Sequence, residues 1–188
     1  VGVGGMGQCA HLKNYASLET CDGVALAEAR AALGQQVARR YGVPRVYTSA
    51  EAMLAAEGLD GIVASQPFSR HGILVPELLK AGVPVFTEKP LAASVEVGER
   101  IVAAVKASGT WHMIGYHKRS DPATMYAKVE IEKLKASHVL GKMTYVRILM
   151  PAGDLVANGF IDLIRTEEPY PQFEWDPPAT DMDPATYQ

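Results

Sequence analysis

Short apolar runs alternate with amphipathic segments along the first 116 residues of the chain. The apolar runs, which we expect to be strands, cover residues 1–3, 23–27, 46–48, 61–65, 83–87 and 111–116. Apolar positions recur at helical spacing between them, which predicts helices over residues 6–17, 30–41, 50–57, 71–81 and 94–108. Continuous apolar strands separated by helices are typical of a parallel sheet covered on both faces. The pattern therefore predicts an α/β fold with a doubly wound parallel sheet.

Serine and glycine mark the ends of several predicted helices. Ser49 and Ser94 stand where a helix N-cap is expected, and Gly42, Gly82 and Gly109 follow the last helical residues. These positions support the element boundaries.

The pattern changes after residue 116. A charged helix is predicted over 123–137, and residues 142–150 alternate polar and apolar side chains, as in a half-exposed strand of an antiparallel sheet. Residues 167–188 contain five prolines and six acids but no Lys or Arg, so we expect an irregular tail that buries little. We therefore predict two domains, over residues 1–117 and 118–188.

Composition narrows the class of protein. The net charge of −3 argues against a nucleic-acid partner, and no apolar run approaches the roughly 20 residues that cross a membrane. Cys9 and Cys21 fit no metal-ligand spacing, so we expect no metal site and a cytoplasmic protein with reduced thiols. The chain begins at Val1 without Met, and we interpret it as a piece of a longer protein, truncated at both ends, whose targeting is unreadable.

The first apolar run leads into the motif G-x-G-x-x-G. Its expected cofactor-binding residues are Gly2, Gly4, Gly5, Met6 and Gly7. In a Rossmann dinucleotide site, the first glycine permits the tight turn, the second lets the backbone approach the pyrophosphate, and the third lets the helix pack close to the strand. The phosphates then lie on free N–H groups at the positive end of the helix. The loop predicts NAD or NADP as the cofactor.

The end of the second predicted strand carries Glu28, which follows Gly7 by 21 residues. A carboxylate there accepts hydrogen bonds from the adenosine ribose hydroxyls. Nearby Arg30 could instead accommodate a 2′-phosphate, which Glu28 would repel, so we favour NAD and leave NADP open.

Polar side chains follow three further strands, at the edge where ligands bind in an open parallel sheet. These candidate cofactor-binding or catalytic residues are Ser65, Gln66, Pro67, His71, Glu88, Lys89 and His117. Lys89 could donate a hydrogen bond to a substrate hydroxyl, and His117 exchanges protons near neutral pH. Pro90 fixes the turn after Lys89 and is a candidate for a preceding cis bond. The alternatives are a surface salt bridge for Lys89, a helix cap for His71 and a polar junction residue for His117.

Together these segments resemble the Gfo/Idh/MocA oxidoreductases over roughly residues 1–150. The resemblance rests on the glycine loop, on Pro67 with His71, on the Glu88-Lys89-Pro90 segment and on the run from Gly115 to Pro122. It implies a Rossmann domain followed by the start of an α/β domain with an open, mostly antiparallel sheet.

The resemblance also implies a function. We expect NAD(P)-dependent oxidation of a hydroxyl on a sugar, cyclitol or related polyol, with Lys89 at the substrate oxygen, in a homo-oligomeric full-length protein. An NAD-dependent glycoside hydrolase of the same fold and a non-enzymatic dinucleotide sensor are the alternatives. Family members carry an Asp/His pair in the second domain whose His is the general base. No His follows His138, so we expect that pair to lie in a missing C-terminal part.

Overall fold

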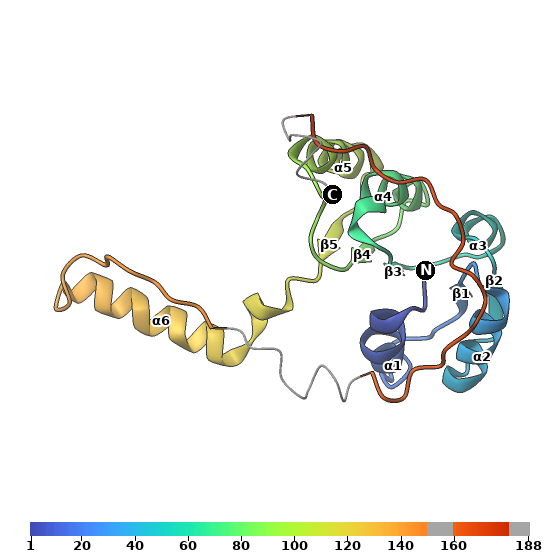
Figure 1. Cartoon of the computed structure of the whole chain (residues 1–188), viewed down its shortest axis with the longest axis horizontal. Coiled ribbons are helices and arrows are strands. Elements are labelled where there is room, and N and C mark those ends of the chain that lie inside the picture. Colours follow the sequence, from blue (N-terminus) through green and yellow to red (C-terminus); the bar gives the residue numbers. More distant parts are fainter. Residues whose placement is uncertain (150–159, 181–188) are drawn as a thin grey trace. The chain divides into compact units, whose positions relative to one another are not determined.

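The computed structural model describes residues 1–149 and 160–180 (Figure 1). Within these ranges, residues 1–115 and 160–180 form one compact unit, and residues 116–149 belong to a second. The division at residues 117 and 118 that the sequence suggested stays a prediction.

Five short strands of the first unit pair in parallel. β1 (Ala25–Ala27) pairs with β2 (Arg45–Tyr47). β3 (Ile62–Ala64), β4 (Val85–Thr87) and β5 (His112–Ile114) pair in that order. Each strand overlaps an apolar run predicted from the sequence, and β2 begins one residue before its run, at Arg45.

The backbone of residues 1–3 lies between the two groups of strands. The Val1 amino group donates to the Val63 carbonyl oxygen at 2.6 Å, and the Ser65 N–H donates to the Val1 carbonyl oxygen at 2.8 Å. On the other side, the Gly2 N–H donates to the Ala27 carbonyl oxygen at 2.8 Å. The resulting order is β2-β1-(1–3)-β3-β4-β5, so the predicted doubly wound parallel sheet is confirmed.

The helices of the first unit follow the strands in alternation. They are η1 (Gly7–Leu12), α1 (Lys13–Tyr15), α2 (Ala31–Tyr41), α3 (Ala50–Ala56), η2 (Phe68–Arg70), α4 (His71–Leu79) and α5 (Val95–Ser108). The Ser49 and Ser94 hydroxyls accept backbone N–H bonds at the starts of α3 and α5, as predicted. Gly42 and Gly109 end α2 and α5 in the left-handed conformation. Within the described ranges, every helix falls short of the length or hydrophobicity that crossing a membrane requires.

Two buried clusters hold the sheet and its helices together. The larger joins β3 and β4 to α4 and α5, and it consists of Ile62, Ala64, Leu74, Val75, Leu78, Leu79, Val85, Val97 and Ile101. The smaller joins β1 to α2, and it consists of Val3, Leu26, Leu33, Val37, Ala38 and Val43. Val3 directly follows Gly2, so the smaller cluster anchors the start of the glycine loop.

The second unit contains η3 (His117–Ser120) and α6 (Pro122–Ser137), whose N-cap Asp121 accepts the Thr124 N–H at 3.0 Å. The strand expected over residues 142–150 is wrong where the structure describes it, because residues 142–149 form no strand. A strand needs a neighbour for its backbone bonds, and no described residue pairs with this segment. Met150 lies outside the described residues, and the described part of the chain contains no antiparallel sheet.

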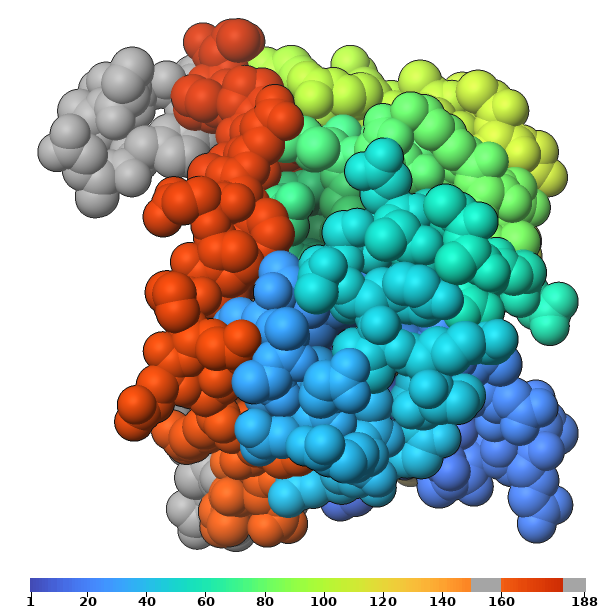
Figure 2. Space-filling model, turned by 90° about the vertical axis from the view of Figure 1, so that its right-hand side faces the viewer, coloured from blue at the N-terminus to red at the C-terminus, as the bar shows by residue number. Residues whose placement is uncertain are grey.

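Residues 160–180, which we call the strap, contain no helix or strand, as expected for the part from residue 167 on. Residues 181–188 of the predicted tail lie outside the described residues. The expectation that the tail buries little is confirmed, because Ala179 is the one buried residue among residues 167–180. The strap nevertheless runs along the first unit and donates and accepts hydrogen bonds there. Figure 2 shows it as an orange-to-red band against the blue and green residues of that unit.

Candidate dinucleotide site

The glycine loop has the backbone that its motif predicts. Gly2 has φ +79°, and a Cβ there would lie 2.5 Å from the Ser65 carbonyl oxygen. A Cβ on Gly7 would overlap the Gly2 carbonyl oxygen, whereas a Cβ on Gly4 would meet nothing within 4 Å. Gly2 and Gly7 therefore serve the turn and the close packing, while Gly4 faces open space that a ligand can approach.

The helix after this loop differs from the others in how it begins. Met6 makes no side-chain cap, and no described side chain accepts from the N–H groups of Gly5, Met6 or Gly7. By contrast, carboxylate or hydroxyl oxygens accept backbone N–H groups at the starts of α2, α3, α4, α5 and α6. Unsatisfied N–H groups at a helix start, beside an open glycine, are the donors that a pyrophosphate needs. The loop therefore fits a dinucleotide.

Glu28 lies at the end of β1, buried beside the loop. Its Oε2 accepts the Val3 N–H at 2.9 Å, and its Oε1 accepts the Arg30 N–H at 3.2 Å and the Arg30 Nε–H at 2.7 Å. Burial raises the pKa of Glu28, but the hydrogen bonds from Arg30 and Val3 outweigh it, so the pKa lies below its usual value. Glu28 is thus a charged acceptor next to the loop, as ribose binding requires.

The residues after β3 line the same edge of the sheet, except for His71. The backbone of Ser65 and the side chain of Gln66 pack against Gly2, and Gln66 Oε1 accepts a bond from Arg70 Nη1 at 3.1 Å. His71 is fully buried, and its Nδ1 lies 3.1 Å from the Leu91 carbonyl oxygen. His71 therefore supports the backbone at Leu91, in the segment that follows Lys89.

Glu88 and Lys89 follow β4, and Glu88 contacts the helix that follows the glycine loop. His11 Nε2 lies 2.8 Å from Glu88 Oε1, and the His11 ring packs edge-on against Phe86 with centroids 5.3 Å apart. The neighbouring Lys89 is exposed, and within the described residues its ammonium makes no hydrogen bond or ion pair. The Lys89–Pro90 peptide is cis, as the sequence suggested.

A polar pair lies beneath this edge, between β4 and β5. Thr87 is fully buried, and its Oγ1 lies 2.8 Å from His112 Nε2. Burial, together with nearby His71, lowers the pKa of His112 to about 4. His112 is therefore a neutral structural residue at physiological pH.

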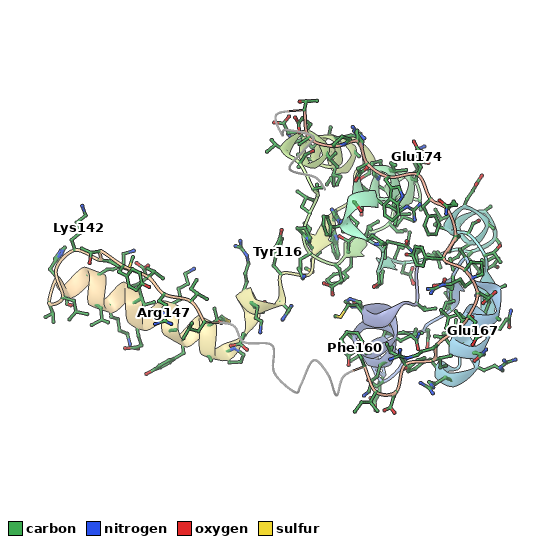
Figure 3. All side chains as sticks on the ribbon, in the orientation of Figure 1. Tyr116, Lys142, Arg147, Phe160, Glu167 and Glu174 are labelled. Atoms are coloured by element: carbon green, nitrogen blue, oxygen red, sulfur yellow. The ribbon has the colours of Figure 1, made fainter. Side chains whose placement is uncertain are left out.

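His117 begins η3 in the second unit, which Tyr116, Lys142 and Arg147 mark in Figure 3. Its proposed catalytic role stays a prediction, as do the cofactor contacts of the other candidates.

Four residues of this region were not foreseen as site residues. Gln8 is buried and exchanges hydrogen bonds with the backbone of Ile164 at 3.0 and 3.1 Å, and His11 binds Glu88. Glu168 and Tyr170 of the strap lie against the start of α2 and against Arg30. These pairs join residues distant in sequence, and no local motif indicates them.

Comparison with known proteins agrees with this geometry. Residues 1–116 match the model of the Gfo/Idh/MocA group, described as an oxidoreductase family with an NAD-binding Rossmann fold. Scyllo-inositol 2-dehydrogenase (NAD(+)) of Bacillus subtilis (strain 168) is 32% identical over 98 residues, which are 52% of this chain and 29% of that protein. Inositol 2-dehydrogenase of Acidothermus cellulolyticus is 28% identical over 141 residues, which are 74% of this chain and 41% of that protein.

Among solved structures, scyllo-inositol dehydrogenase of Lactobacillus casei, crystallised with NAD(H) and scyllo-inositol, superimposes with a TM-score of 0.66 at 24% identity. The match covers 71% of this chain and 40% of that one, and it supports the fold. The matched part of the chain covers less than half the length of each of these three proteins.

Proposed function

Because the chain belongs to the Gfo/Idh/MocA oxidoreductase family, with its NAD-binding Rossmann fold over residues 1–116, we propose that the whole protein is an NAD-dependent dehydrogenase. The proposed substrate is a cyclitol, a sugar or a related polyol, and the reaction oxidises one of its hydroxyl groups. The two curated relatives, both named as inositol dehydrogenases, support this class.

The observation that carries the proposal is the position of Lys89. It lies two residues after the end of β4, at the sheet edge of the glycine loop, and its neighbour Glu88 is held by His11 from the helix after that loop. A lysine ammonium that is exposed at this edge, and that has no partner among the described residues, is available to a ligand.

In this proposal, different residues of the chain bind the cofactor and act on the substrate. The N–H groups of Gly5, Met6 and Gly7 bind the pyrophosphate, and Glu28 accepts from the ribose. Lys89 donates to the substrate oxygen and stabilises its negative charge as the hydroxyl proton leaves. His117 is the candidate proton acceptor within this chain. When bound, the nicotinamide supplies the hydride acceptor.

The test is a screen of polyols and sugars with NAD⁺ and NADP⁺, followed through the absorbance of the reduced nicotinamide. In Lys89→Ala we expect NAD⁺ affinity, measured by calorimetry, to stay within about twofold, while turnover falls by about 100-fold or more. Lys106→Ala, at an exposed lysine on α5, is the matched control and leaves both unchanged. Full turnover in Lys89→Ala would remove the role of that lysine.

The homo-oligomeric assembly and the cytoplasmic location expected from the sequence stay predictions. The general base expected from the Asp/His pair of the family is likewise untested, and His117 is the alternative that this chain offers.

A further inference from the structure

The strap follows the helix starts at the edge of the sheet where the dinucleotide is proposed to bind. Near its beginning, the Phe160 ring lies against Gly5, where a Cβ would approach it to 2.8 Å. Further along, Glu168 bonds to the start of α2 and Asp176 to the start of α4. Phe160, Glu167 and Glu174 mark its course in Figure 3.

Glu168 binds the first turn of α2 with both carboxylate oxygens. Oε1 accepts the Ala32 N–H at 3.2 Å, and Oε2 accepts the Leu33 N–H at 3.1 Å and the Thr166 hydroxyl at 3.2 Å. Exclusion of water raises the pKa of Glu168, but these backbone bonds outweigh it and hold the pKa below its usual value. Glu168 is therefore an anion at the positive end of a helix of 11 residues.

The start of α2 is also where a 2′-phosphate would have to be recognised. Glu28, the proposed ribose acceptor, ends β1, and α2 begins three residues later at Ala31. A phosphate on the ribose would need hydrogen bonds from free N–H groups at this helix start and from an arginine.

Both kinds of donor are already engaged by carboxylates of this chain. Glu168 takes the N–H groups of Ala32 and Leu33, and Glu28 takes Arg30 at 2.7 Å. The Arg30 guanidinium also lies over the Tyr170 ring of the strap, 5.2 Å from its centroid. A 2′-phosphate would therefore meet two negative charges, and the N–H groups of Ala32 and Leu33 and the Nε–H of Arg30 are already engaged.

We propose that Glu168 is a specificity residue, which fills the 2′-phosphate position with an anion of the chain and so selects NAD over NADP. The inference rests on the proposed function and sharpens it, because it assigns cofactor choice to the strap as well as to Glu28. An ordinary ribose with a free 2′-hydroxyl leaves the bonds between Glu168 and α2 intact.

The experiment measures binding of NAD⁺ and NADP⁺ to the full chain by isothermal titration calorimetry, without substrate. In Glu168→Gln, which keeps the shape and removes the charge, NADP⁺ affinity should rise by about tenfold, while NAD⁺ affinity stays within about twofold. Glu168→Asp keeps the charge and should retain the preference of the unaltered chain. Glu167→Gln is the matched control, because that neighbouring side chain is exposed, and it should change neither affinity.

Three results would overturn the inference. They are equal affinity of the unaltered chain for the two dinucleotides, an unchanged NADP⁺ affinity in Glu168→Gln, and the same gain in Glu167→Gln, which would indicate a general charge effect. In each of these the chain still binds NAD⁺, so the proposed function stands. Failure of the unaltered chain to bind NAD⁺ would overturn the proposed function and this inference with it. Thermal melting of each variant verifies that it is folded.

Discussion

The glycines of the loop have different roles, and single glycine-to-alanine substitutions can distinguish these roles. A Cβ on Gly7 would overlap the Gly2 carbonyl oxygen, whereas one on Gly4 meets no atom within 4 Å. We expect Gly7→Ala to lower the free energy of unfolding by about 1–3 kcal/mol, because backbone must shift. Gly4→Ala should leave stability nearly unchanged and weaken NAD⁺ binding by about tenfold or more, because the methyl group occupies the approach of the pyrophosphate.

Chemical denaturation and calorimetry on the two variants provide the comparison, and each variant is the control for the other. A Gly4→Ala chain that binds NAD⁺ normally would contradict the role given to that open space.

At the scale of single residues, the sequence predicts the role of a residue where that role follows from a local motif. Gly2, Gly7 and Glu28 lie in one short stretch and could be assigned from spacing. His11 and Glu168 could not, because each acquires its partner through the folded backbone, across 77 and 135 residues.

His112 of β5, whose Nε2 lies 2.8 Å from Thr87 Oγ1 of β4, predicts a pH dependence of stability, because burial and nearby His71 lower its pKa. The pKa of His112 is about 4 in the folded chain and about 6.5 when unfolded. Between these values the unfolded chain binds more protons, so stability should fall as the pH drops from about 6.5 to about 4. The loss attributable to His112 should be at most about 3 kcal/mol, because the residue is half-buried.

Urea denaturation at several pH values measures this slope. His112→Asn has no titrating group at that position, so its curve should be flatter over the same range. Parallel curves for the two chains would contradict the assignment.

Whole helices were predictable where local capping residues mark their first and last positions. Ser49 and Ser94 cap helices locally, so α3 and α5 begin where the sequence places them. The alternating segment 142–149 carries the polarity of a strand, but polarity alone provides no neighbouring strand, and the described chain provides none.

The strap is fastened to the first unit at several separate points, and Asp176 is one of them. Its Oδ2 accepts the Gly72 N–H at 2.8 Å, and its own N–H donates to the Ser69 carbonyl oxygen at 2.7 Å. Asp176→Ala removes the charged cap and should increase hydrogen exchange at Gly72 and along the strap by about tenfold. Glu174→Ala is the control, because its carbonyl oxygen, which Arg70 binds, is retained.

Mass spectrometry of deuterium uptake gives the measurement peptide by peptide. Equal exchange in Asp176→Ala and Glu174→Ala would show that the Asp176 cap does not hold the strap in place.

At the scale of the molecule, the sheet order follows from the alternation of strands and helices, but the path of the strap does not. Its prolines and acids suggest an irregular tail that buries little. The structure gives the acids another use, because Glu168 and Asp176 meet helix starts that lack side-chain caps of their own.

The late position of the strap in the chain has a consequence for protein synthesis. The ribosome completes the strands and the glycine loop well before residues 160–180 emerge, and the bond between Gln8 and Ile164 closes across 156 residues. Because domains fold from the N-terminal side during translation, the glycine loop forms on the nascent chain before the strap can contact it. A dinucleotide can therefore reach the loop before the strap arrives.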